Sequence, residues 1–297
     1  MGVRRDAVLA WATLQIDRIG DAAFARLFSD HVALPGIAPA EYAHRRLSCR
    51  HGALVGGIRF HGRDVARPFV EVVLHSFDDH FALAQSVAAE WRAFAPGALR
   101  LRRAPGAARP AGAWLDQGIH LARYRDMGSA AGQVRLDRFA QVGQAARLAA
   151  AHHEKGGRYD PELRRNLTAP GPADLRRLQQ GGRLRAIRDG GAVAGLIAAA
   201  PGAVDWIQGD VIEAEIVASG QTGRGLAAAA QAALAAEAVT AGRGDVLLIG
   251  AIDRRNHASR RTAERAGRPG LLELVFVPLP APDQASPPPS KWSGSAG

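Results

Sequence analysis

The sequence contains very little cysteine, and this excludes several kinds of site. Cys49 is the only cysteine among the 297 residues. A disulfide within the chain is therefore impossible, and a metal site built from several cysteine ligands is excluded. Nothing else in the sequence predicts a metal ion, so we expect none.

Long apolar runs are also missing. No segment approaches the ~20 apolar residues that a membrane-spanning helix needs. Near the amino terminus, Arg4 and Arg5 precede a short apolar run at 7–14. Gln15 and Asp17 interrupt that run, and no small-residue cleavage site follows, so a signal peptide is not expected. We expect a cytoplasmic protein without a membrane partner.

Acidic residues are too few to balance the basic ones. The chain has 38 Lys and Arg against 28 Asp and Glu, which gives a formal net charge of +10 at pH 7. Such an excess is typical of proteins that bind nucleic acid. The arginines are scattered over many segments, however, and lysines do not alternate with aromatic residues. We therefore expect an anionic small-molecule ligand rather than a nucleic acid.

Strand and helix signals alternate in both halves of the chain, which predicts an α/β protein. Branched residues predict strands at 53–60 and 69–75, and apolar residues at helical spacing predict a helix that starts at Asp78 or Asp79. A strand is also expected at 11–16. Further elements are expected at 21–32, 99–102, 118–124, 134–139, 141–153, 174–180, 183–188, 193–199, 211–217, 226–239, 246–252, 256–266 and 271–277.

The length of the chain predicts roughly two domains. Residues 103–112 have linker chemistry, with two prolines and no apolar periodicity, and a boundary is expected near 128–132. We expect an N-terminal domain over 1–127 and a C-terminal domain over 128–280. Residues 281–297 are rich in Pro, Ser and Gly and are expected to be a disordered tail.

The most informative stretch is 215–227, Glu-Ile-Val-Ala-Ser-Gly-Gln-Thr-Gly-Arg-Gly-Leu-Ala. It predicts a buried strand that ends in a glycine-rich turn and leads into an alanine-rich helix. The first backbone N–H groups of such a helix lack intrahelical partners and concentrate partial positive charge, which suits a phosphate. Gly223 and Gly225 let the backbone approach an anion closely, because they have no Cβ.

Together with a second motif, this turn resembles the GNAT superfamily of acyl-CoA N-acyltransferases. The counterparts of the first signature, Val-x-Pro-x-x-(Arg/Gln)-Gly-x-Gly-x-(Gly/Ala), are Val217, Ser219, Thr222, Gly223, Gly225 and Ala227. The counterparts of the second, Asn-x-x-Ala/Ser with Glu and Gly on the following turns, are Asn256, Ser259, Glu264 and Gly267. The resemblance covers residues 131–280. It implies a twisted mixed sheet, mostly antiparallel and flanked by helices.

The resemblance also implies that acetyl-CoA, or another acyl-CoA, is the cosubstrate. Main-chain N–H groups of 222–227 would hold its pyrophosphate, and its pantetheine arm would lie between the strands at 211–217 and 246–252. Arg260 or Arg261 would reach the phosphates, although a solvated helix face explains these arginines equally well. The residues expected to bind the cosubstrate are Ile216, Val217, Ser219, Thr222, Gly223, Arg224, Gly225, Leu226, Ala227, Asn256, Ser259 and Arg260.

A catalytic base is expected on the strand that leads to the glycine turn. Glu213 and Glu215 are two residues apart, which places them on the same face of a regular strand. In the resembling family a carboxylate on this strand serves as the base, so Glu215 is the first choice and Glu213 the second. The alternative is that one or both are solvated or bind substrate. The tyrosine that often acts as the acid corresponds to Ala263, which leaves Ser259, a water or the departing amine proton.

The first half has the same strand–helix rhythm but lacks the glycines. Its corresponding turn carries Asp78 and Asp79, an acidic pair that would repel phosphate. We therefore expect two GNAT-like domains, of which only the C-terminal one binds CoA. The expected protein is an N-acetyltransferase, a monomer or homodimer, that acts directly on a small-molecule amine. The alternative is a non-catalytic acyl-CoA-binding or interaction protein.

Overall fold

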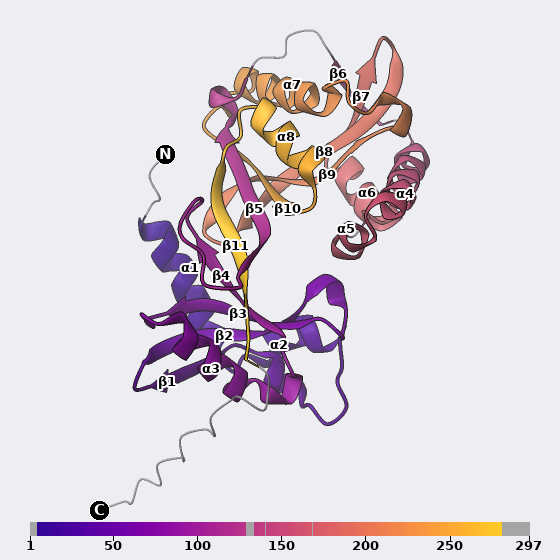
Figure 1. Cartoon of the computed structure of the whole chain (residues 1–297). Helices are drawn as coiled ribbons and strands as arrows, with labels where there is room; N and C mark the ends of the chain where they lie inside the picture. Colours follow the sequence, from indigo (N-terminus) through magenta and orange to yellow (C-terminus); the bar gives the residue numbers. More distant parts are fainter. Residues whose placement is uncertain (1–4, 129–133, 140, 168, 281–297) are drawn as a thin grey trace, which may run out of the picture. The chain divides into compact units, whose positions relative to one another are not determined.

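The computed structural model describes residues 5–128, 134–139, 141–167 and 169–280, with backbone alone at 155–159. It contains two compact units (Figure 1). Unit 1 comprises Met1–Leu115 and Leu274–Gly297, and unit 2 comprises Asp116–Glu273. The expected boundary at 127/128 thus lies within unit 2, and the expected disordered tail lies outside the described residues.

Unit 1 is a four-stranded sheet extended by residues 274–278 of β11. Strands β1, β2 and β3 pair antiparallel in sequence order, and β4 then pairs parallel to β3. Its elements are α1 (Arg5–Asp17), α2 (Ala22–Ser29), β1 (Arg45–Cys49), β2 (Gly52–Phe60), β3 (Pro68–His75), α3 (His80–Glu90), β4 (Ala98–Arg103) and β11 (Gly270–Pro278).

Helix α3 begins where the sequence predicts. The side chain of Asp79 caps it by accepting hydrogen bonds from the backbone N–H groups of Phe81 and Ala82, as an N-cap carboxylate does. Leu83 and Val87 are fully buried and belong to the core cluster of unit 1. Burial of this apolar stripe is what holds the helix against the sheet.

The strand expected at 11–16 is wrong, because this segment belongs to α1. Helix α1 as a whole contains Ala7, Ala10 and Ala12 together with Leu9 and Leu14, and alanine and leucine are strong helix formers. Leu9, Leu14 and Ile16 are about half exposed, at 54%, 50% and 48%. The apolar residues of α1 are thus not gathered on one buried face of the helix. The helix therefore forms because of local helix propensity rather than because of the apolar pattern.

Unit 2 has the strand order β5-β10-β9-β8-β7-β6. Strand β10 is antiparallel to β5 but parallel to β9, so the sheet is mixed. The protein is thus an α/β protein, as the sequence predicts. The elements are β5 (Trp114–Arg123), β6 (Arg135–Arg138), α4 (Val142–Tyr159), α5 (Pro161–Asn166), α6 (Pro172–Gln180), β7 (Leu184–Asp189), β8 (Ala192–Val204), β9 (Ile207–Val217), α7 (Leu226–Thr240), β10 (Leu247–Asp253) and α8 (His257–Arg265).

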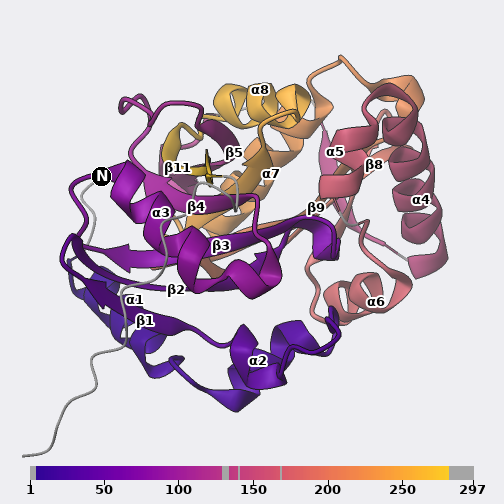
Figure 2. The same ribbon diagram turned by 60° about the horizontal axis from the view of Figure 1, so that its bottom comes forward.

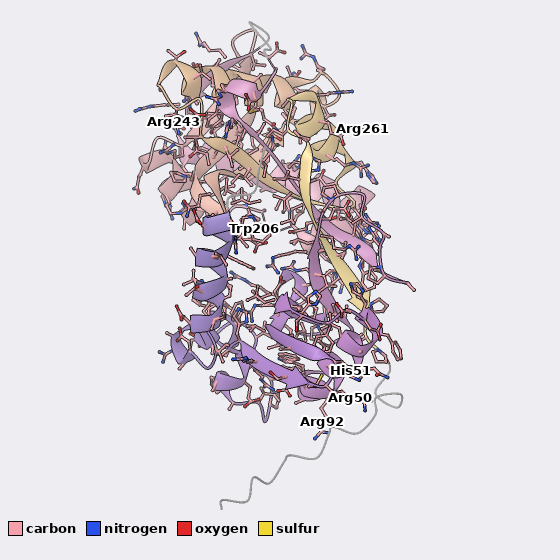
Figure 3. All side chains as sticks on the ribbon, turned by 90° about the vertical axis from the view of Figure 1, so that its left-hand side faces the viewer. Arg50, His51, Arg92, Trp206, Arg243 and Arg261 are labelled. Atoms are coloured by element: carbon pink, nitrogen blue, oxygen red, sulfur yellow. The ribbon has the colours of Figure 1, made fainter. Side chains whose placement is uncertain are left out.

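Helices cover both faces of the long β8–β9 hairpin, whose turn holds Trp206 (Figure 3). Helices α4 and α6 lie on one face (Figure 2), where they pack with Ala214 and Ile216 of β9. Helix α7 lies on the other face, where it packs with Ile197 of β8. No helix among the described residues is long and apolar enough to cross a membrane.

Candidate active site

Strands β9 and β10 start side by side and then separate. At Gly209 they are so close that a Cβ would lie 2.4 Å from the carbonyl oxygen of Leu247. Their parallel pairing consists of Asp210 with Leu248 and Val211 with Ile249. Beyond Val211, β9 runs to Val217 without pairing to β10. The result is a wedge-shaped opening between the carboxyl ends of the two strands.

The main chain of β9 presents hydrogen-bonding groups to this opening. The carbonyl of Ile216 points toward β8, because a Cβ on Gly195 would lie 2.2 Å from it. Main-chain groups alternate in direction along a strand, so those of Glu215 and Val217 point into the opening. An extended ligand lying there finds a free strand edge. Ile216 itself meets the opening through its side chain.

The glycine turn leads into α7 with an uncapped helix start. Gly223 and Gly225 have φ of +84° and +76°, a left-handed conformation that favours glycine, and a Cβ on either would meet open space. Gly225 is the N-cap and provides no side-chain cap. Within the described residues, nothing accepts from the N–H groups of Leu226, Ala227 and Ala228. This exposed helix start is a ready site for an anion.

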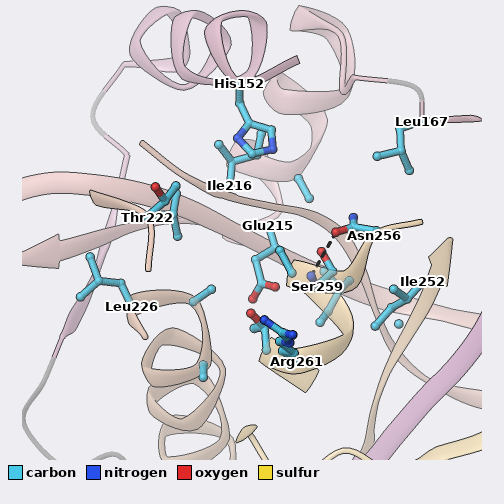
Figure 4. Close-up of a pocket in the computed structure, with 18 of the residues that line it drawn as sticks. His152, Leu167, Glu215, Ile216, Thr222, Leu226, Ile252, Asn256, Ser259 and Arg261 are labelled. Atoms are coloured by element: carbon cyan, nitrogen blue, oxygen red, sulfur yellow. Dashed lines mark hydrogen bonds between the residues drawn. The ribbon is translucent and has the colours of Figure 1, made fainter. Parts of the chain in front are cut away.

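A pocket of about 550 Å³ joins the opening to the helix start. Glu215 points from β9 into its middle, and Ser259 and Arg261 approach from α8 (Figure 4). His152 of α4 faces it from the other side, with Leu167 at the edge. In the described part of the chain, no group of three or more His, Cys, Asp or Glu side chains is arranged to hold a metal ion.

Helix α8 presents polar side chains to this pocket. Asn256 caps the helix, its Oδ1 accepting from the backbone N–H of Ser259 at 3.0 Å (Figure 4). This leaves the Asn256 amide hydrogens available to a ligand. Ser259 and Thr262 bring two hydroxyl groups to the pocket. Ala263, the counterpart of the expected tyrosine, is fully buried and does not line the pocket.

Glu213 and Glu215 do not share a face, contrary to the expectation from their spacing. Ala198 pairs with Ala214 and Ala199 with Ile212, so Glu213 is the extra residue of a β-bulge. Glu213 forms an ion pair with Arg177 of α6 at 2.5 Å. Glu215 is hydrogen-bonded on the opposite side of the sheet, to α7. The bulge thus gives the two carboxylates different surroundings within one pocket.

The environment of Glu215 favours its neutral form. Burial raises the pKa of this carboxyl above its ordinary value, while a hydrogen bond from Gln231 and the charge of Arg268 oppose the shift. The side-chain amide of Gln231 donates to both carboxylate oxygens, at 2.8 and 3.0 Å. A half-buried carboxyl with a raised pKa on the wall of a pocket is typical of a general base.

The structure brings most of the expected cosubstrate residues together. Three of them do not line the pocket. Ser219 lies in a short 3-10 turn before the glycines, and Arg224 forms an ion pair with Asp189 at 2.7 Å. Arg260 contacts His257 on the outer side of α8. The expected residues that do line it are Glu213, Glu215, Ile216, Val217, Thr222, Gly223, Gly225, Leu226, Ala227, Asn256 and Ser259.

Sequence reasoning missed several residues of the site. Thr262, Arg265 and Arg268 line the pocket, and Gln231 holds Glu215. Gln231 is the one residue among these with a visible signal, because it is a buried-face amide in an otherwise alanine-rich helix. Arg268 follows the glycine that ends α8, and nothing in the sequence around it predicts that its guanidinium is buried.

No family model and no curated protein matches the sequence. Solved structures do match. A GNAT-family acetyltransferase from Colwellia psychrerythraea aligns over 87% of this chain and 95% of its own, with 13% identity and a TM-score of 0.52. A tandem GNAT protein from the clavulanic acid biosynthesis pathway aligns over 93% and 95%, with 14% identity and a TM-score of 0.43. The chain has the GNAT fold.

Proposed function

We propose that unit 2 is an acyl-CoA-dependent N-acyltransferase that transfers acetyl from acetyl-CoA directly to the amine of a small molecule. One observation carries this proposal. The opening between β9 and β10 combines a free strand edge, an uncapped helix start and the half-buried carboxyl of Glu215 in one pocket. These are the parts that binding and deprotonation require.

The residues present fit the CoA portion of the cosubstrate. The free N–H groups at the start of α7 suit its pyrophosphate, and the left-handed glycines keep Cβ atoms away from that anion. The free edge of β9 suits the amide groups of pantetheine, and the amide of Asn256 lies on the same pocket. Arg261 lines the pocket whereas Arg260 contacts His257, which supports Arg261 as the arginine that contacts a phosphate in this proposal.

The chemistry follows from three groups of this chain. Glu215, as carboxylate, removes a proton from the attacking amine, directly or through water. The backbone N–H of Val217 points into the opening and stabilises the negative charge that develops on the thioester oxygen. The carbon–nitrogen bond forms and the carbon–sulfur bond breaks. Ser259 or Thr262 then relays a proton from water to the departing thiolate and regains its own, while Glu215 returns the proton taken from the amine to water, so that the products are the amide and the free thiol of CoA.

The acceptor enters on the α4 side of the pocket in this proposal. His152, His153 and Leu167 line that side, and Glu213 lies near it with its charge balanced by Arg177. We propose that this wall holds the amine-bearing molecule. In this proposal the two histidines contact the acceptor. The alternative is that they are ordinary residues near the end of a helix, with no role in binding.

We also propose that unit 1 is a degenerate copy of the same fold that does not bind CoA. In both units a bulged antiparallel strand is followed by a helix and a parallel strand. In unit 1, however, Asp79 already occupies the N–H groups at the helix start. An anion there would meet a carboxylate instead of free donors.

The test replaces Glu215 by Gln. We expect turnover, measured as free CoA released from acetyl-CoA with a panel of primary amines, to fall by about 10²–10⁴-fold. Affinity for acetyl-CoA stays close to wild type, because the helix start is untouched. Glu213→Gln, on the other face of the sheet, loses much less.

The result also decides between an enzyme and a non-catalytic acyl-CoA-binding protein. The buried Ala263 in place of a tyrosine acid favours the second candidate. If the wild-type protein binds acetyl-CoA but releases no CoA with any amine, the binding protein is the better description. Full turnover in Glu215→Gln would show that another group is the base.

A further inference from the structure

Helix α7 carries one buried polar side chain in its alanine-rich sequence. Gln231 is 0% exposed, and its neighbours on the buried face include Ala230 and Ala235. A buried amide without partners is costly, so its contacts define its role. Its Nε2 donates to both carboxylate oxygens of Glu215, and its Oε1 accepts from Nε of Arg268 at 2.9 Å.

Only one orientation of the Gln231 amide satisfies both neighbours. A carboxylate accepts hydrogen bonds and a guanidinium donates them, so the NH₂ group must face Glu215 and the oxygen must face Arg268. Arg268 therefore fixes the amide, and the amide fixes the carboxylate. The three side chains form one chain of hydrogen bonds from the end of α8 to the wall of the pocket.

Arg268 is held so firmly that it can serve as the anchor of this chain. It is 2% exposed, and its Nη1 donates to the carbonyl of His120 at 3.1 Å. Its own backbone N–H donates to Ala263 at the end of α8. Gly250 of β10 leaves room for the guanidinium, because a Cβ there would lie 2.8 Å from Nη1.

The interposed amide has a chemical consequence. A direct ion pair with arginine would favour the charged carboxylate strongly and make it a weak base. Among the described residues Glu215 has no ion pair, and its hydrogen-bond donor is the neutral amide. The carboxylate is thus held in place while its oxygens keep lone pairs for a substrate proton.

We propose that Gln231 and Arg268 are positioning residues for the general base: Arg268 orients the Gln231 amide, and Gln231 holds the Glu215 carboxylate toward the opening between β9 and β10. This inference rests on the proposed role of Glu215. It adds that the base depends on two residues outside the signature motifs, one on α7 and one after α8.

Other charged groups face the same pocket and must be considered when its pH dependence is measured. They come from β9, α4, β10 and α8. In the described residues these groups are Glu213, His152, His153, Asp253, Arg261 and Arg265.

The experiment measures the titration of Glu215 directly, by carbon-13 NMR of labelled glutamate carboxyls, with Glu215→Gln to assign the resonance. The variant is Gln231→Leu, which keeps the volume and removes the donor. We expect Glu215 to titrate at higher pH than in wild type, because burial remains and the stabilising hydrogen bond is lost. The matched control is Glu237→Gln, an exposed carboxylate on the same helix, paired with Arg185, whose loss leaves the titration unchanged.

The kinetic measurement is the pH dependence of kcat/KM with acetyl-CoA and a primary amine, on the acidic side of the profile where kcat/KM falls as Glu215 is protonated. In Gln231→Leu this fall moves to higher pH. At pH values below it, kcat/KM is therefore roughly tenfold lower than in wild type, which corresponds to the loss of one hydrogen bond to a charged group. Acetyl-CoA affinity stays unchanged. A loss of packing alone would lower stability without moving this fall to higher pH.

A second variant keeps the proposal testable if Gln231→Leu does not fold. Arg268→Lys retains the buried charge but lacks the Nε–H that orients Gln231, and it shifts the titration in the same direction by less. A folded variant in which Glu215 titrates as in wild type overturns the proposal. If the titration shifts while Glu215→Gln keeps full turnover, the network stands and the proposed base fails.

Discussion

Strand β3 of unit 1 and strand β9 of unit 2 have the same pairing pattern, but they lead to helix starts of different kinds. Each pairs parallel with a later strand, up to Glu71 in β3 and Val211 in β9. Each then has a bulge two residues further on, at Val73 and at Glu213. His75 therefore occupies in unit 1 the position that Glu215 occupies in unit 2.

The connections to the next helix explain why only one of these strands leads to a helix start that is free to bind an anion. Four residues, 76–79, separate His75 from α3, whereas ten, 216–225, separate Glu215 from α7. The shorter connection has no room for a glycine turn, and its Asp79 caps the helix. A free helix start thus requires both the extra residues and the absence of a capping side chain.

The strand edges differ as well. In unit 1, Nη1 of Arg102 donates to the carbonyl of Val72 at 3.1 Å, just beyond the last parallel pair. The same guanidinium pairs with Glu71, which Arg100 also contacts. In unit 2 the edge beyond Val211 borders the pocket. The same strand geometry therefore supports a closed ion-pair cluster in one unit and an open site in the other.

The largest effect is expected at Glu71. Burial opposes ionisation of this carboxyl, but Arg100 and Arg102 outweigh it and lower its pKa. Glu71→Gln removes the buried carboxylate charge that pairs with Arg100 and Arg102, and should reduce the free energy of unfolding by roughly 3–5 kcal/mol, measured by urea denaturation. Because the folded pKa is lowered, the difference from wild type should shrink as the pH falls through it. Glu90→Gln, the control at a more exposed pair with Arg45, should cost about 0–1 kcal/mol.

The second effect has the opposite sign. The pKa of Glu215 is raised by burial, so this carboxyl destabilises the fold once the pH rises above its unfolded pKa. Glu215→Gln should therefore stabilise the protein by about 0.5–2 kcal/mol near pH 8. The gain should shrink as the pH falls toward 4, where the carboxyl is mostly protonated in both states. Thermal melts at the two pH values check this, and a loss of Tm at pH 8 would contradict it.

The smallest effect is expected at the cap of α3. Asp79→Ala should cost about 1 kcal/mol of stability, the usual value for losing an N-cap side chain. Acetyl-CoA affinity should not change, since CoA is proposed to bind at the start of α7 and not at α3. Denaturation and binding measured on the same preparation check both points, and a weakened affinity would argue that unit 1 takes part in binding.

The sequence was sufficient to predict the features that depend on neighbouring residues. The Asp79 cap, the glycine turn and the strands on either side of α7 all follow from local patterns, and the fold they indicate is confirmed. Two features could not be predicted this way. The bulge at Glu213 depends on the register of β9 with β8. The spacing of two residues therefore predicted wrongly that Glu213 and Glu215 lie on the same face of the strand. The buried Arg268 depends on a tertiary contact with Gln231 and on space left by Gly250.

The direct test of the account is a calorimetric titration with acetyl-CoA. The wild-type chain should bind one molecule, at unit 2, and Gly225→Val should lose most of the affinity because valine is strained at the left-handed φ of +76° that the turn requires. Absence of binding in the wild type, two molecules per chain, or unchanged affinity in a folded Gly225→Val protein would contradict it.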